Sequence, residues 1–193
     1  MGESTALVTR GAGMLRTPRL VLRPLSPTDA KNFFPILKDP AIYRFIPEDP
    51  PASMDALRKQ FERFVRGPAP DLLEVWMNWG VFFDDEPIGR VQSTIRVPAR
   101  MGEIAYVFGM AHRKQGLASE AVFTMCEWLF KHWFEVATAT IDSRNLDSMA
   151  LVTRLGFHEV SRVANAEFFK GTPSHEVIFA CRSQDLCRPR PLL

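Results

Sequence analysis

The sequence has no long apolar segment and almost no imbalance of charge. None of its apolar stretches approaches the roughly 20 residues that a membrane-spanning helix needs, and the first residues lack the basic, apolar leader of an exported protein. Lysine and arginine number 24 against 22 aspartates and glutamates, a net charge of +2, so no overall field attracts nucleic acid or anionic membranes. We therefore expect a cytoplasmic protein with no membrane or nucleic-acid partner, in which any anion site is local.

Cysteine is scarce, and its three copies, Cys126, Cys181 and Cys187, form no C-x-x-C pair. Their odd number favours a reducing compartment, and the apolar helical surroundings of Cys126 predict a buried, inert thiol. No pair of histidines stands at metal-ligand spacing with cysteine or carboxylate, so we expect no metal. The motifs G-x-x-x-x-G-K-[ST] and G-x-G-x-x-G are missing too, which excludes the usual nucleoside triphosphatase and dinucleotide sites.

The length of 193 residues suits a single domain. We expect a flexible N-terminal arm over residues 1–16, one domain over residues 17–183 and a flexible tail over residues 184–193. Two helices are expected early in the domain, because Ser26 and Ser53 each stand where an N-cap would satisfy the first free amides.

Strand composition and alternation predict a β-rich chain interrupted by helices. The strongest helical spacing runs from Leu117 to Trp133, and a shorter helix is expected from Ser148 to Leu155. The expected strands cover residues 19–25, 75–83, 88–97, 103–108, 136–142, 157–163 and 175–182. The pattern predicts an α+β fold with about six to seven strands and about four helices.

The stretch HRKQGLASEA, residues 112–121, enters the best helix with little side-chain bulk. Gly116 and Ala118 leave the first helical amides bare, and these amides carry the positive end of the helix dipole. Arg113 and Lys114 add local charge, and Ser119 offers a hydroxyl. The stretch therefore predicts a phosphate or diphosphate site, although a glycine near a helix start is by itself common in ordinary loops.

Four segments in order resemble the GNAT acetyltransferase superfamily, in particular the branch that includes the ribosomal-protein N-terminal acetyltransferases. Its acyl-CoA loop has the pattern Q/R-x-x-G-x-G/A, which residues 113–118 match. The other resembling segments are TPRLVLRPL (17–25), EIAYVFGMAHRKQGLASEA (103–121) and NLDSMALVTRLGF (145–157). The resemblance spans residues 17 to about 182. It implies a three-layer α/β arrangement around a mixed, mostly antiparallel sheet, in which the strand ending at Phe108 diverges from the one beginning near Val136.

The resemblance also implies acetyl-CoA as cosubstrate and assigns the residues that bind it. The pantetheine arm would pair with the backbone of the strand ending at Phe108, the diphosphate would meet the amides from Lys114 to Ser119, and Asn145 with Ser148 would lie near the thioester. The implied cofactor-binding residues are Val107, Phe108, Gly109, Arg113, Lys114, Gln115, Gly116, Leu117, Ala118, Ser119, Asn145 and Ser148. Asn145 equally fits a helix cap.

Glu103 is the candidate general base, because the family often uses a carboxylate at this strand, directly or through water. The alternative is a solvated glutamate at a strand end. The family's usual acid is a tyrosine at the position of Val152, and its absence is common to the branch that this chain resembles. His175 stands where the branch usually has aspartate, and a lone strand histidine is more often simply hydrogen-bonded.

The activity implied by the resemblance is transfer of acetyl from acetyl-CoA to a primary amine. An α-amino group, with a pKa near 8, is about a tenth neutral at pH 7, whereas lysine is neutral to roughly one part in a few thousand. This favours a protein or peptide N-terminus or an amino acid, and leaves amino sugars and polyamines open. The rival hypothesis is a non-catalytic acyl-CoA sensor. Monomer and homodimer are both open, and Phe45, Trp76, Trp79 and Tyr106 are candidate linings of the acceptor pocket.

Overall fold

The computed structural model describes residues 13–189 and forms one eight-stranded sheet with helices on both faces. The strand order is β1-β2-β3-β4-β5-β6-β8-β7. Every neighbouring pair is antiparallel except β5 and β6, which are parallel. The mixed, mostly antiparallel α+β fold is thus confirmed, with one strand more than the upper expectation.

The element bounds follow the expected segments closely. The strands are β1 (Leu15–Arg16), β2 (Leu20–Pro24), β3 (Glu74–Phe83), β4 (Glu86–Arg96), β5 (Met101–Phe108), β6 (Val136–Asp142), β7 (His158–Phe169) and β8 (Thr172–Arg182). The α-helices are α2 (Ala30–Leu37), α3 (Met54–Arg66), α4 (Leu117–His132) and α5 (Leu146–Arg154). Four 3₁₀ turns join them: η1 (Pro27–Asp29), η2 (Pro40–Tyr43), η3 (Met110–His112) and η4 (Ser183–Asp185).

Local sequence chemistry sets several of these boundaries. Ser26 and Asp29 form a reciprocal capping box at η1, and the Ser53 side chain accepts from the Ala56 amide at the start of α3. Asp84 and Asp85 both adopt left-handed backbone angles between β3 and β4, as the expected hairpin turn requires. These signals were readable because each acts within a few residues.

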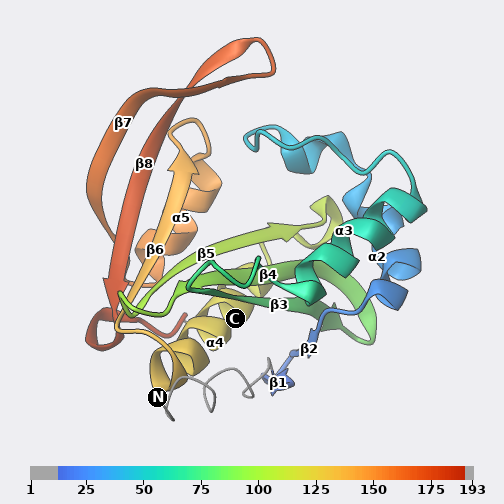
Figure 1. Cartoon of the computed structure of the whole chain (residues 1–193), viewed down its shortest axis with the longest axis horizontal. Coiled ribbons are helices and arrows are strands. Elements are labelled where there is room, and N and C mark those ends of the chain that lie inside the picture. Colours follow the sequence, from blue (N-terminus) through green and yellow to red (C-terminus); the bar gives the residue numbers. More distant parts are fainter. Residues whose placement is uncertain (1–12, 190–193) are drawn as a thin grey trace.

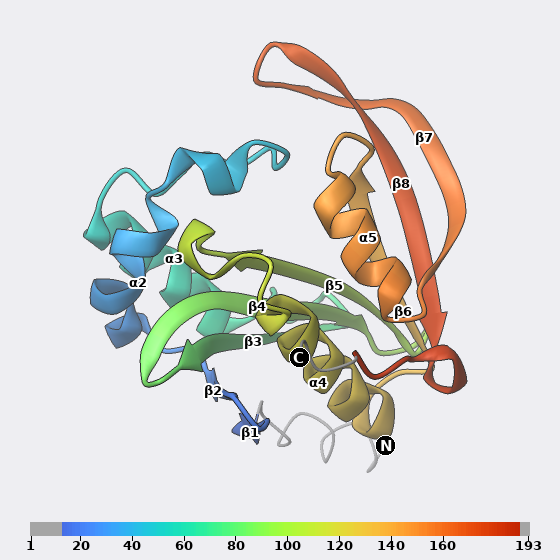
Figure 2. The same ribbon diagram turned by 180° about the vertical axis from the view of Figure 1, so that it is seen from behind.

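Two apolar clusters hold the layers together. Helices α4 and α5 cover one face of the sheet, where Trp79, Val122 and Leu155 are fully buried. Helices α2 and α3 cover the other face, where Phe33 and Phe61 pack edge-on. Figures 1 and 2 show the two helical layers from opposite sides of the sheet. Burial of these side chains supplies most of the stabilisation.

Both chain ends depart from the expected flexible segments. Leu15 and Arg16 pair with β2 as strand β1, so the expected arm ends earlier, and residues 1–12 lie outside the described residues. In the described part of the expected tail, residues 184–189, the chain contacts α4 and the end of α5. The Cys187 amide donates to the Leu155 carbonyl at 2.9 Å, and Arg188 pairs with Glu127 of α4 at 2.8 Å. Residues 190–193 lie outside the described residues.

The sheet opens between β5 and β6. These strands pair only over Met101–Glu103 and 136–138, and no register continues beyond Glu103. At Gly102 a Cβ atom would lie 2.1 Å from the Phe134 ring, so a larger residue there would displace this ring from the core. The divergence expected between the strand ending at Phe108 and the strand beginning at Val136 is confirmed.

The hairpin of β7 and β8 is much longer than the two expected strands, and Figure 1 shows it rising past α5 toward the segment after η2. In the part of the chain that the structure describes, no helix is both long and apolar enough to span a membrane.

Candidate active site

A cavity of about 230 Å³ occupies the opening between β5 and β6. Its walls come from β4, β5, β6, the start of α5 and the segment that follows η2. The lining residues are Tyr43, Phe45, Ile46, Pro47, Glu48, Arg90, Gln92, Ile104, Ala105, Tyr106, Val107, Ala139, Thr140, Ile141, Asp142, Asn145 and Ser148. The cavity thus brings together three of the candidate cofactor residues, Val107, Asn145 and Ser148.

The backbone of β5 presents free hydrogen-bonding groups to this opening. Val107 pairs with Arg90 of β4, and the Gly109 amide donates to the Ile88 carbonyl at 2.9 Å. Because successive residues of a strand point their amides to opposite sides, Tyr106 and Phe108 turn theirs away from β4 toward the opening. Of the two expected pantetheine-pairing residues, Phe108 therefore offers backbone groups, whereas Val107 offers its side chain.

The start of α4 lies beyond the far end of β5. Gly116 is the N-cap with φ of 74° in the left-handed region, and no side chain caps the helix amides. Leu117 and Ser119 are buried, while Arg113, Lys114 and Gln115 are exposed. The bare helix start expected from the sequence is therefore formed, with the cationic side chains beside it.

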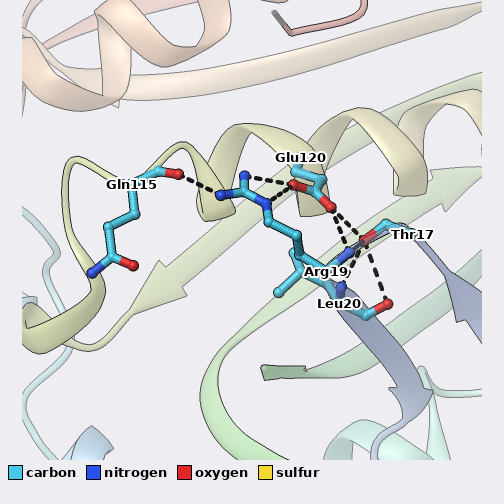
Figure 3. A network of polar contacts seen from close by, with 5 residues as sticks. All are labelled: Thr17, Arg19, Leu20, Gln115 and Glu120. Carbon is cyan, nitrogen blue, oxygen red and sulfur yellow. Dashed lines mark hydrogen bonds and ion pairs between the residues drawn. The ribbon is translucent and has the colours of Figure 1, made fainter. Parts of the chain in front are cut away.

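A polar network fixes this helix start to the N-terminal strand, as Figure 3 shows. Arg19 donates from Nη1 to the Gln115 carbonyl at 2.9 Å and pairs through Nη2 with Glu120 at 2.6 Å. The Thr17 hydroxyl donates to the same carboxylate. The network neutralises the one acidic side chain in the first turn of α4. Sequence reasoning missed it, because Arg19 and Glu120 are 101 residues apart.

Arg113 and Asn145 both have structural partners of their own. Arg113 Nη1 lies 3.6 Å from Asp147 Oδ2, a pair exposed enough to contribute little to stability. Asn145 accepts from the Ser148 amide at 3.3 Å and so caps α5, as the helix-cap interpretation required. Its side chain also lines the cavity.

Tyr106 is the tyrosine that reaches the start of α5. Its hydroxyl donates to the Ser148 carbonyl at 3.2 Å, and burial raises its pKa, so the phenol stays protonated. Val152, at the position of the family's usual acid, is fully buried. Of the other aromatic candidates, Phe45 lines the cavity, whereas Trp79 lies in the core and donates to the Gly13 carbonyl at 2.8 Å.

Glu103 lies at the apex of the opening but does not line the cavity. The Thr140 hydroxyl donates to its carboxylate at 3.0 Å, and Arg96 lies 3.6 Å away. Thr140 pairs with Ile178 of β8, and Glu176 stands two residues along on the same face of that strand. Partial burial raises the pKa of Glu176, and the charges of Glu167 and Glu103 raise it further. Glu176 is a carboxylate that sequence reasoning missed.

Asp142 lines the cavity and accepts hydrogen bonds from two neighbouring side chains. Arg144 donates to both of its carboxylate oxygens, at 2.8 and 2.6 Å, and the buried Ser174 hydroxyl donates at 2.7 Å. Burial by itself raises the Asp142 pKa, but these hydrogen bonds outweigh it and lower the pKa to about 2. The carboxylate is therefore a poor proton acceptor near neutrality and serves to fix Arg144.

The tip of the β7–β8 hairpin contacts the segment that follows η2. Lys170 at its tip donates to the Ile46 and Glu48 carbonyls at 2.6 and 2.9 Å, and lies 3.7 Å from Asp49. The Arg144 guanidinium lies 5.5 Å from the ring centre of Phe169 in the hairpin and 6.0 Å from that of Phe45. Both figures show the hairpin tip and the segment after η2 approaching each other. The hairpin tip is thus joined to residues 46–49, three of which line the cavity.

The remaining polar candidates have ordinary roles. His175 Nδ1 accepts from the Asn165 amide at 3.2 Å, as expected of a hydrogen-bonded strand histidine. Cys126 is fully buried and its pKa is raised by burial, as expected of an inert core thiol. Within residues 13–189 no group of three or more histidine, cysteine, aspartate or glutamate side chains is arranged to hold a metal.

Solved structures share this arrangement. RimL, a ribosomal L7/L12 α-N-protein acetyltransferase in complex with coenzyme A, aligns with TM-score 0.79 and 17% identity over 88% of this chain and 97% of its own. A GNAT-family acetyltransferase of Bacillus anthracis aligns with TM-score 0.76 and 17% identity, covering 89% of this chain and 99% of its own. A GNAT-family protein of Chromobacterium violaceum aligns with TM-score 0.76 and 24% identity, covering 91% of each chain.

At these identities the likeness shows the fold, and no curated protein sequence matches the chain. The family follows from the sequence match. The family model described as the acetyltransferase (GNAT) domain matches residues 19–158, which contain β5, the bare start of α4 and the asparagine-capped α5. Because this model matches more than half of the 193 residues, the chain belongs to the GNAT acetyltransferase family.

Proposed function

We propose that this acetyltransferase uses acetyl-CoA and transfers the acetyl group to a primary amine by direct attack in a ternary complex. The observation that carries the proposal is the opening between β5 and β6, where a free strand edge faces a cavity and leads to a bare helix start. One end suits a diphosphate and the other an amine. Binding of a thioester carrier accounts for the free strand edge, the cavity and the bare helix start together.

The diphosphate is assigned to the amides of residues 114–119. Gly116 can hold its left-handed angle without strain, so the backbone approaches the ligand closely. Arg113 and Lys114 supply exposed charge. Arg19 fits the same purpose, because it neutralises Glu120, which would otherwise repel the phosphates from the first turn.

The pantetheine arm is assigned to the free edge of β5, beside Val107 and Phe108, with Gly109 at its end. An amide-bearing arm that runs along this edge satisfies backbone groups which β6 has left unpaired. Asn145 and Ser148 border the opposite side, so the thioester would lie between them and β5.

The cosubstrate supplies an activated acyl carbon, and the chain's residues position the reaction around it. The amine lone pair attacks that carbon, the C–S bond breaks, and coenzyme A leaves as the thiolate, which then takes a proton from water. A β5 amide turned into the opening, that of Phe108 or a neighbour, is placed to donate to the developing oxyanion. The proton lost by the amine goes to a carboxylate.

Glu103 is the candidate for that base, and Glu176 is a second one. The Thr140 hydroxyl donates to Glu103 and Arg96 lies 3.6 Å from it. Glu176 has a raised pKa, which favours proton uptake nearer neutrality. The two carboxylates share one face of the sheet. Either acts directly or through water, as the distance to the amine requires.

An amine panel with detection of released thiol tests the proposal. We expect thiol release in equal amount to acetylated amine, identified by mass, with α-amines preferred over lysine side chains. Glu103→Gln and Glu176→Gln are compared across pH with Glu135→Gln, an exposed glutamate paired with Arg100, as control. The base is the residue whose replacement lowers turnover most at mildly acidic pH. Binding of coenzyme A without thiol release on any amine would support the non-catalytic sensor instead.

A further inference from the structure

Arg90 is a buried cation in the wall of the cavity. It lies in β4 opposite Val107, on the α2–α3 side of the sheet, and is only 8% exposed. Its Nη1 donates to Gln92 Oε1, and its guanidinium lies 5.0 Å from the Phe64 ring centre. Both partners are neutral, so the charge is oriented but not compensated.

Carboxylates do not pair with Arg90 in the described part of the chain. Among residues 13–189 none lies within 4.0 Å of the guanidinium. Glu48 acts on it only at longer range, and its exposed side chain belongs to the segment under the hairpin tip. Burial lowers the pKa of Arg90, which reflects the cost of removing this charge from water, yet a guanidinium stays protonated in proteins.

A buried charge of this kind calls for an anionic partner. A guanidinium has five N–H donors, and a charge buried without a counter-charge is costly to folding. Because Arg90 lines the cavity, the missing anion can come from a ligand. The diphosphate is a poor source, since its assigned helix, α4, covers the opposite face of the sheet.

We propose that Arg90 binds a carboxylate of the acceptor, which makes it a specificity-determining residue for an amine that carries a carboxylate in the same molecule. A free amino acid has this chemistry, and so does a peptide N-terminus followed by an acidic residue. The inference rests on the proposed function and names the substrate class of the same site. A planar guanidinium fits a carboxylate through two parallel hydrogen bonds, which lysine cannot reproduce.

Room for a peptide exists beside this position. A second hollow of about 230 Å³ lies next to the cavity on the same face and shares Gln92 with it. Phe64, which stacks near Arg90, and Trp76 line this hollow. Residues beyond the first of a peptide acceptor could lie there, whereas a free amino acid would use the first cavity alone.

Matched acceptors test the inference by steady-state kinetics. One pair is a short peptide with glutamate or glutamine at its second position, and the other is an amino acid and its carboxamide. We expect kcat/KM to favour the acid by about 10- to 100-fold, as a charge-assisted hydrogen bond predicts. Arg90→Gln should remove the preference and Arg90→Lys should retain part of it. Arg66→Gln, an exposed arginine of α3, is the control and should leave the preference unchanged.

The outcomes separate this inference from the proposed function. Turnover with equal kcat/KM for acid and amide, unchanged in Arg90→Gln, overturns the inference and leaves acetyl transfer standing. Without turnover on any amine, calorimetry of the same peptides with the coenzyme A-loaded protein decides. Tighter binding of the acid that is lost in Arg90→Gln supports the inference, and equal binding overturns it. Coenzyme A affinity and melting temperature establish that each variant is folded. If Arg90→Gln does not fold, Arg90→Lys is compared with the unaltered protein instead.

Discussion

Replacement of Arg19 by glutamine tests whether the turn between β1 and β2 prepares the proposed coenzyme A loop. Arg19 donates to the Gln115 carbonyl at 2.9 Å and pairs with Glu120 at 2.6 Å. The Arg19 side chain is 37% exposed and the Glu120 side chain 16%. A hydrogen bond to a charged group contributes about 1.5 to 3 kcal/mol, and partial exposure favours the lower figure. Coenzyme A binding needs the loop in the position that these contacts hold. We therefore expect a loss of about 1.5 kcal/mol in binding free energy, which is roughly tenfold weaker coenzyme A binding.

The charge on Glu120 is the second part of the effect. Without Arg19, this carboxylate in the first turn of α4 repels a diphosphate at the same helix end. The double variant Arg19→Gln with Glu120→Gln removes the repulsion but does not restore the hydrogen bond to the Gln115 carbonyl. We therefore expect it to bind coenzyme A about threefold better than Arg19→Gln alone, and the gain to shrink at high salt.

Titration calorimetry at low and high salt measures both effects. Arg16→Gln is the matched control, since Arg16 is exposed in the neighbouring strand β1. Coenzyme A binding by Arg19→Gln within twofold of the unaltered protein would refute the reasoning. So would a double variant that binds more weakly than Arg19→Gln.

Three further outcomes follow from other parts of the site. Gly116→Ala should lower stability by about 1 kcal/mol because alanine resists the left-handed angle, and Gly116→Glu should weaken coenzyme A binding well beyond that variant, as melting curves and calorimetry would show. Asp142 has a folded pKa of about 2, below its unfolded value near 3.9, so its contribution of about 3 kcal/mol is present above pH 4 and lost as pH falls toward 2. Denaturant titrations between these pH values should show a smaller loss for Asp142→Asn, and equal losses would argue against the assigned pKa. Lys170→Gln should raise KM for the acceptor severalfold with coenzyme A affinity unchanged, since its three contacts join the hairpin tip to the segment with Ile46 and Glu48, which line the cavity.

The sequence by itself determined the elements and the family. Ser26, Ser53 and Asn145 cap helices as expected, and Gly116 opens α4 with bare amides. These features are readable because caps, turns and strand alternation are set by interactions within a few residues. The resemblance implied that the strand ending at Phe108 diverges from the one beginning near Val136, and the short pairing of β5 with β6 confirmed it.

Only the tertiary structure decided what surrounds those elements. Arg19 meets Glu120 across 101 residues, and Lys170 meets the Ile46 carbonyl across 124. Arg90 becomes a candidate binding residue only because the sheet places it in the cavity wall. Glu176 becomes a candidate base only because β8 pairs with β6. No periodicity along the chain encodes such pairs, since their partners are chosen by the order of strands in the sheet and by the burial that follows.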